Sequence, residues 1–244
     1  MKKTSKALLL TICAVLLVAA SVMGTMAYLT SADEVKNTFT VGKVAIKLDE
    51  AEVDANGKAV EPAVRVQANE YKLLPGHTYT KDPTVTVLKD SVESYVRMKV
   101  TFNNAAEIIA MCTDPEFAED GPTGVENAFP LIRMVKFVEA NAAKWDGIIP
   151  DNMVDTEEML EDTKYFAYDE ESDTLTYIFY YAETVAAPDG NVVLPVLFDR
   201  ITVPEWVTGD QLAKLDKFEI NAVAEAIQAD GFANADVAWA AFDA

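Results

Sequence analysis

The side chains that could do chemistry begin with a single histidine. His77 follows a Pro-Gly pair in the segment 74–78, and Pro-Gly is a strong turn signal. A hydrolytic zinc site needs several ligands around an open position, and a Ser-His-Asp or Cys-His unit would have to use this same histidine. The chain contains no His-Glu-x-x-His sequence and no Gly-rich phosphate loop. We therefore predict a turn histidine exposed to solvent, and assign no catalytic residue, no metal ligand and no cofactor.

Carboxylates are the second group of candidates. Two of them held about 5–9 Å apart across a cleft can hydrolyse glycosides. In a chain with 40 acids, however, adjacent acids arise by chance, and we expect them to be solvated. Residues 54–57 (Asp-Ala-Asn-Gly) resemble the start of a calcium loop but lack the full ligand series, so we predict a hairpin turn there. The adjacent pairs are Asp49/Glu50, Glu157/Glu158, Glu161/Asp162 and Glu170/Glu171.

The first 27 residues have the three parts of a secretory signal peptide. Three lysines within the first six residues precede an uncharged apolar run over 7–22, and small residues follow up to Ala27. The alternative is an uncleaved membrane anchor, but the run is shorter than the ~20 residues that a spanning helix needs. We predict cleavage after Ala27, which makes Tyr28 the new N-terminus.

Charge and cysteine content restrict the partners and the compartment. The leader holds three of the 20 Lys and Arg residues and none of the 40 acids, so the remainder carries a net charge of about −23. Phosphates of nucleic acids and anionic membranes repel such a body, so no nucleic-acid partner is expected. Removing Cys13 with the leader leaves Cys112 alone. No intrachain disulfide can then form, a pattern that fits export from a Gram-positive bacterium.

Period-two alternation dominates the remaining 217 residues and predicts strands. We expect 85–87 to form the first arm of a hairpin with 92–102, turning near Lys89-Asp90. A second hairpin joins 164–168 to 174–181. The run 192–203 is apolar on both faces, which predicts a central strand. A late strand starts near Phe218 and continues to Ala226. The strands are expected at 85–87, 92–102, 164–168, 174–181, 192–203 and 218–226.

Helical segments are few and short. We expect pieces over 104–112 and over 208–215, where Thr208 can cap the helix, and an apolar-faced helix over 234–242 that docks on the body. The acidic stretch 151–162 fits either a surface helix or a loop. The sequence therefore predicts a mainly β, jelly-roll-like sandwich with a C-terminal helix. One domain over 43–244 would carry an insertion at about 104–162.

A register slip separates the segment 28–42 from the predicted body. Apolar residues fall on odd positions at Phe39 and Val41, but on even positions from Val44 onward. Gly42 lies at the slip, where glycine permits a bulge or bend. One interpretation is a single bent strand. The other is a separable strand, which can complete the sheet of another molecule through its unpaired backbone groups.

Eight short segments form a recognisable set of motifs: 24–30 (GTMAYLT), 37–44 (NTFTVGKV), 74–76 (LPG), 81–85 (KDPTV), 197–198 (LF), 201–204 (ITVP), 218–221 (FEIN) and 226–232 (AIQADGF). The N-terminal and late blocks are the most specific of them. Together these motifs resemble the TasA/camelysin family, exported proteins whose leaders are cut by a SipW-type signal peptidase.

The resemblance implies a secreted jelly-roll protein of the cell surface or biofilm matrix of a Gram-positive bacterium. TasA-like subunits form fibres by donor-strand complementation, so the partners would be further copies of the chain, and other matrix or surface proteins. The candidate donor strand includes Tyr28, Leu29, Phe39, Val41 and Gly42. Two alternatives remain: a monomeric surface adhesin on the same fold, and a camelysin-like metallopeptidase, against which the single histidine argues.

Overall fold

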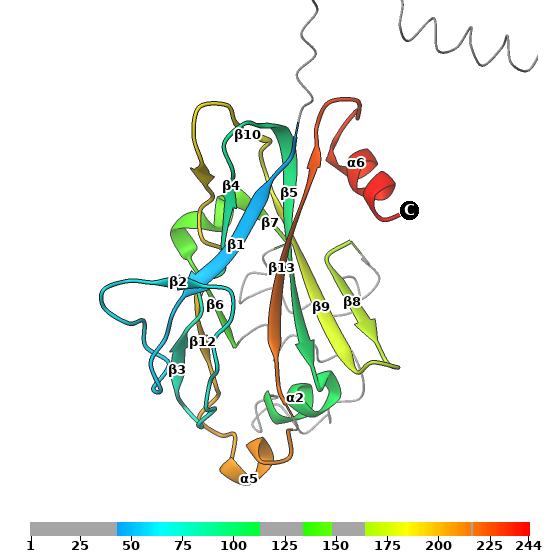
Figure 1. Ribbon diagram of the computed structural model, residues 1–244. Coiled ribbons are helices and arrows are strands. Elements are labelled where there is room, and N and C mark those ends of the chain that lie inside the picture. Colours follow the sequence, from blue (N-terminus) through cyan, green and yellow to red (C-terminus); the bar gives the residue numbers. More distant parts are fainter. Residues whose placement is uncertain (1–42, 113–133, 148–163, 216) are drawn as a thin grey trace, which may run out of the picture. The chain divides into compact units, whose positions relative to one another are not determined.

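The strand β5 (Ser91–Asn103) is the longest strand among the described residues. The computed structural model, drawn in Figure 1, describes residues 43–112, 134–147, 164–215 and 217–244. The strand predicted over 92–102 is confirmed, since Val96, Met98, Val100 and Phe102 on one face are buried. On the opposite face, Arg97 is also buried and only 1% exposed.

The largest sheet forms around β5. β13 (Ile220–Gln228) pairs along one edge of β5, and β9 (Thr174–Tyr181) and β10 (Val185–Ala187) pair along the other. β8 (Phe166–Asp169) joins β9 as the predicted hairpin. All of these pairs are antiparallel, as is the pair between β9 and the two-residue β7 (Trp145–Asp146). The two late predicted strands, 174–181 and 218–226, are therefore confirmed.

Two smaller antiparallel sheets complete a mainly β, sandwich-like architecture. One has the order β11-β4-β1-β2 and the other the order β3-β12-β6. Their strands are β1 (Ile46–Ala51), β2 (Arg65–Val66), β3 (Thr78–Thr80), β4 (Thr84–Val87), β6 (Val135–Phe137), β11 (Val192–Val193) and β12 (Phe198–Thr202).

The predicted hairpin between 85–87 and 92–102 is wrong. The chain does turn after β4, where the Ser91 N–H donates to the Leu88 carbonyl at 3.2 Å and Asp90 has φ 67°. However, β4 pairs with β1 and β11, whereas β5 pairs with β9, β10 and β13. The turn therefore carries the chain from one sheet to another.

The predicted central strand over 192–203 is two strands. β11 is an exposed edge, with Val193 63% exposed, whereas β12 lies in the middle of the three-stranded sheet. Pro195 lies between them, and proline has no N–H to continue a ladder. Alternation alone does not show this change of sheet.

Helices connect and cover the sheets. Thr208 caps α5 as predicted and forms a capping box with Gln211, but the helix ends at Leu212 and not at 215. β6, the 3₁₀ helix η3 and β7 fall within the expected insertion, yet β6 pairs with β12 and β7 with β9. No helix in the described ranges is long and apolar enough to cross a membrane. The helices are α2 (Ala105–Cys112), η3 (Glu139–Lys144), α5 (Gly209–Leu212) and α6 (Ala235–Phe242).

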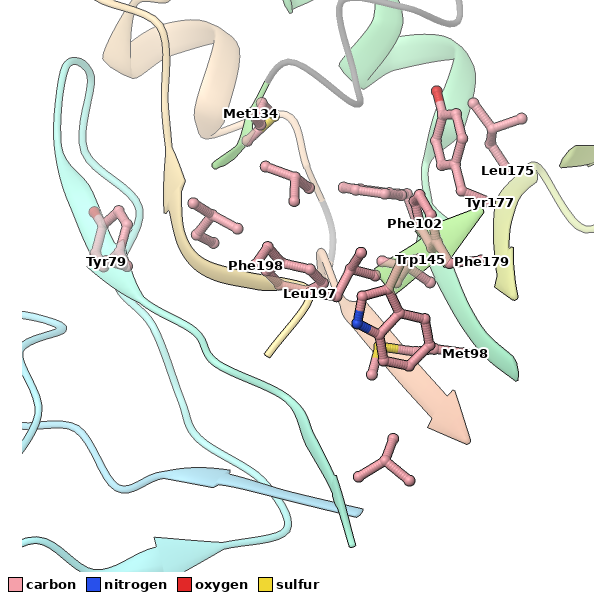
Figure 2. Packing of buried hydrophobic residues seen from close by; sticks show 14 of the residues in the cluster. Tyr79, Met98, Phe102, Met134, Trp145, Leu175, Tyr177, Phe179, Leu197 and Phe198 are labelled. Atoms are coloured by element: carbon pink, nitrogen blue, oxygen red, sulfur yellow. The ribbon is translucent and has the colours of Figure 1, made fainter. Parts of the chain in front are cut away.

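The hydrophobic core joins the sheets through large apolar side chains. Figure 2 shows Leu197, just before β12, and Phe198, its first residue, lying near Phe102, Trp145 and Met98. The Trp145 indole N–H donates to the Pro195 carbonyl at 2.8 Å, so its polar atom is satisfied inside the core. Burial of such side chains is the main favourable term in folding.

Truncating a core ring should destabilise the fold strongly. Phe179 on β9 is 1% exposed, and removing a buried Phe side chain typically costs about 3–5 kcal/mol. We expect Phe179→Ala to lower the free energy of unfolding by about that amount in urea titrations. Val193→Ala, on the exposed β11 edge, is the control and should change it by less than about 0.5 kcal/mol. Equal effects of the two variants would contradict the assigned core.

Candidate functional site

The free edge of β13 is the first component of the candidate site. Among the described residues, β13 pairs only with β5. The Asn103 N–H donates to the Glu219 carbonyl, and the Ala229 N–H to the Glu93 carbonyl. Because hydrogen-bonding directions alternate along an antiparallel strand, odd-numbered residues of β13 face β5. The N–H and C=O groups of Ala222, Ala224 and Ala226 therefore face away from it.

β1 presents a second edge that is only partly covered. The Leu88 N–H donates to the Ala45 carbonyl, so odd-numbered residues of β1 face β4. The backbone groups of Ile46 and Leu48 point to the other side, where β2 pairs only with Glu50 and Ala51. Figure 1 shows β1 and β13 passing next to each other. Among the described residues, no strand lies between β1 and β13 and pairs with the facing edge of either one.

A groove of about 650 Å³ lies at this seam. β1 contributes Leu48 to its lining, and the beginning of β13 contributes Ile220 and Ala222. The loop before β3 contributes Tyr71, and Ile201 on β12 is a further lining residue. Every residue of β13 is at least partly exposed, although Ile220, Ala224 and Ala226 contact the core. The groove thus combines apolar side chains with two strand edges.

Charged side chains form one wall of the groove. The adjacent pair Asp49/Glu50 was expected to be solvated, and this is wrong: the two residues are 8% and 6% exposed. Lys81 is equally buried, and its Nζ lies 2.8 Å from Oε2 of Glu50. Asn69 donates from Nδ2 to Oε1 of the same carboxylate at 2.9 Å. Each buried charge is therefore paired, as burial requires.

Asp49 belongs to a neighbouring ion-pair network. Arg65 Nε donates to its Oδ1 at 2.9 Å, and Lys47 lies 2.6 Å from its Oδ2. Arg65 also binds the carboxylate of Asp82. Burial acts to raise the pKa of Asp49, but Lys47 and Arg65 outweigh it and hold the pKa below its ordinary 3.8. The network ties β1, β2 and the turn before β4 together.

The other chemistry-bearing residues form turns. His77 lies in the Pro-Gly turn as predicted, but it is half-buried. Its ring packs against Tyr79, and its Nε2 lies 2.9 Å from the Asn56 carbonyl oxygen. Asp54 accepts from the N–H groups of Asn56 and Lys58, so segment 54–57 is the predicted turn. No group of three metal-ligating side chains occurs in the described ranges. Glu170 and Glu171 are exposed in the β8–β9 turn.

Several predicted residues lie outside the described part of the chain. They include the cleavage site at Ala27 and Tyr28, the remaining donor-strand residues Leu29, Phe39, Val41 and Gly42, and the acid pairs at 157–158 and 161–162. Those assignments remain predictions. Val44, Ile46 and Leu48, on the body side of the register slip, are half-buried, and the last two contact the core.

Sequence reasoning missed the buried arginine that binds the C-terminal helix. Arg97 donates from Nε to Glu225 at 2.6 Å and from Nη1 to Asp243 at 2.7 Å. Its guanidinium lies 4.3 Å from the centre of the Trp239 ring and also faces Phe242. The predicted docking of 234–242 is thus confirmed, except that Phe242 is 44% exposed. The sequence signal was the Arg in an alternating strand together with the aromatic helix at the end of the chain.

The comparisons with known proteins return no relative: no family model, no curated protein and no solved structure matches the chain. The geometry of the site therefore carries the functional argument.

Docking of α6 should depend on the charge of Asp243. The hydrogen bond from Arg97 holds the pKa of Asp243 below its ordinary 3.8. A carboxylate whose pKa is lower in the folded state stabilises the fold at pH values above its pKa in the unfolded state. This stabilisation is lost as the pH falls through its pKa in the folded state. We expect backbone hydrogen exchange over 237–243 to quicken below about pH 4 relative to the core strands. Asp243→Asn should quicken it at neutral pH and remove the acid dependence.

Asp236 supplies the matched control. Asp236 is also on α6, and its Oδ1 lies 3.3 Å from Nζ of Lys164, outside the helix. Its side chain is 75% exposed, and exposed ion pairs contribute little to stability. Asp236→Asn should leave the exchange at neutral pH nearly unchanged. An unchanged exchange rate in Asp243→Asn would contradict the assigned role of the Arg97 pair.

Proposed function

We propose that this chain is a secreted structural protein of the cell surface or biofilm matrix of a Gram-positive bacterium. Copies would join by strand donation: the segment 28–42 of one molecule occupies the seam between β1 and β13 of the next. A SipW-type signal peptidase would cut after Ala27 and release the donor segment. The open seam is the observation that carries the proposal.

Backbone geometry supports strand donation. Ile46 and Leu48 on one side, and Ala222, Ala224 and Ala226 on the other, direct N–H and C=O groups toward the seam. An added strand could pair with one of these rows, as in β-augmentation. Long edges left open are a liability that natural proteins normally cover or blunt. The nine residues of β13 have no second partner strand in the part of the chain that the structure describes, which favours an interaction role.

The character of the groove fits the proposed donor. Its lining includes Leu48, Ile220, Ala222 and Ile201, and the alanines of β13 leave room for larger side chains. Phe39 and Val41 are apolar at alternate positions, so both would face the same side of an inserted strand. Their burial would add a hydrophobic contribution to the backbone hydrogen bonds.

Removing the donor segment tests the proposal directly. We expect purified 28–244 to form fibres visible by electron microscopy, because each molecule carries both a donor and a seam. A chain that starts at Lys43 should remain monomeric, since it keeps the seam but lacks the donor. Fibres from both chains, or from neither, would contradict strand donation. Two stable monomers would instead favour the adhesin alternative.

Blocking the seam gives an independent prediction. Proline at position 224 removes an N–H that faces the seam and leaves the odd-numbered ladder bonds to β5 intact. A backbone hydrogen bond contributes about 1 kcal/mol net, and the ring also obstructs an approaching strand. We expect Ala224→Pro to reduce fibre yield at least ~10-fold by sedimentation, with little change in monomer folding by circular dichroism.

A second edge proline provides the control. The Leu194 N–H donates to the Val85 carbonyl, so by alternation the Val193 N–H points away from β4. Val193→Pro therefore places the same residue on another exposed edge, outside the seam. It should assemble like the unmodified chain. Equal inhibition by the two prolines would argue against the seam as the acceptor.

A further inference from the structure

One carboxylate in the groove wall joins a lysine to an asparagine. Glu50 accepts from Nζ of Lys81 at 2.8 Å through Oε2, and from Nδ2 of Asn69 at 2.9 Å through Oε1. Glu50 and Lys81 are 6% and 7% exposed. A buried amine and a buried carboxylate are therefore held next to the carboxamide of Asn69, which is half-buried. This is more than an ion pair needs, because the third member is an uncharged amide.

The carboxamide of Asn69 is fixed in one orientation. Its second N–H donates to the Ala51 carbonyl at 2.8 Å, and its Oδ1 accepts from the Val53 N–H at 3.0 Å. A backbone N–H aimed at a carbonyl oxygen polarises that carbonyl and stabilises negative charge that develops on the oxygen during attack. The Tyr71 ring lies beside the site, with its centre 5.7 Å from Nζ of Lys81.

We propose that Lys81 and Asn69 become joined by an intramolecular isopeptide bond, with Glu50 as the acid–base group. Positioned acid–base groups and fixed orientation are the two general means of accelerating such a transfer. The bond would form within one folded chain, and it does not depend on strand donation or on any partner.

The reaction balances without an added reagent. The ammonium of Lys81 first transfers a proton to Glu50, and the neutral amine attacks Cγ of Asn69, forming the Nζ–Cγ bond. Glu50 returns the proton to Nδ2, the Cγ–Nδ2 bond breaks, and ammonia leaves. The remaining excess proton on Nζ passes to Glu50. The products are an amide, one molecule of ammonia and a protonated Glu50, so no oxidant, nucleotide or metal is consumed.

Such a bond would close the chain between 69 and 81 into a ring. Asn69 lies in the loop between β2 and β3, and Lys81 directly follows β3. The loop covers one side of the groove, and Asn69, Tyr71 and Lys81 all line the groove. The bond would hold this wall in place even when local hydrogen bonds open. An ion pair would not survive denaturation, whereas the amide would.

Mass spectrometry of the chain without substitutions tests the proposal. We expect an intact mass lower than the sequence mass by one ammonia. Trypsin should yield peptide 66–72 linked to peptide 73–89, because a modified Lys81 resists cleavage, and fragmentation should place the branch at Asn69 and Lys81. Asn56-Gly57 can also lose ammonia by forming a succinimide, but that product is a linear peptide. Complete recovery of linear 66–72 and 73–81 would overturn the proposal.

Variants test the role of each group. Lys81→Arg and Glu50→Gln should abolish the branched peptide, because they remove the nucleophile and the proton carrier. Asn69→Asp should form the same bond with loss of water instead of ammonia. Lys144→Arg alters another Lys–Glu pair, at 2.9 Å to Glu183 on the surface, and should keep the branched peptide. An undiminished yield of the branched peptide in Glu50→Gln would exclude Glu50 as the acid–base group. Where a variant fails to fold, the peptide map of the chain without substitutions still decides whether the bond exists.

Discussion

The packing around β5, which buries its inner face and Arg97 on its outer face, is the constraint on which the rest of this structure depends. Its inner face supplies Val96, Met98, Val100 and Phe102 to the core, and both of its edges are paired. Its outer face carries Arg97, whose charge would be costly to bury without partners. Glu225 on β13 and Asp243 after α6 supply them. Arg97 therefore helps to hold the C-terminal helix in place, together with the buried Trp239.

The contrast between β5 and β13 explains why the candidate site lies where it does. β5 is paired along both edges, whereas β13 pairs along one edge only among the described residues. A strand-binding site works best when its walls are already in place before binding. The groove wall meets this requirement through Glu50, Lys81 and Asn69, which cross-connect β1 to the loop before β3. A covalent bond there would make the same wall permanent.

Pairing between residues far apart in the sequence decided which acidic residues are buried in the groove wall. Asp49/Glu50 could not be distinguished from the other acid pairs by sequence, because the partners of Glu50 lie 19 and 31 positions away. By contrast, the turns at His77 and at 54–57 were predicted correctly, since Pro-Gly and Asn-Gly act locally. The half-burial of His77 was not, because it arises from its packing on Tyr79.

The sequence by itself determined the strand-rich character, the alternating faces of β5 and β9, the Thr208 cap and the existence of the C-terminal helix. These depend on neighbours within a few residues, whose periodicity and capping chemistry are local. Only the tertiary structure decided that β4 leaves β5 for another sheet, that Arg97 is buried, and that β1 and β13 border an open seam. Such features arise where distant segments meet, and the free energy that selects them comes from burial and charge pairing between residues that the sequence does not place together.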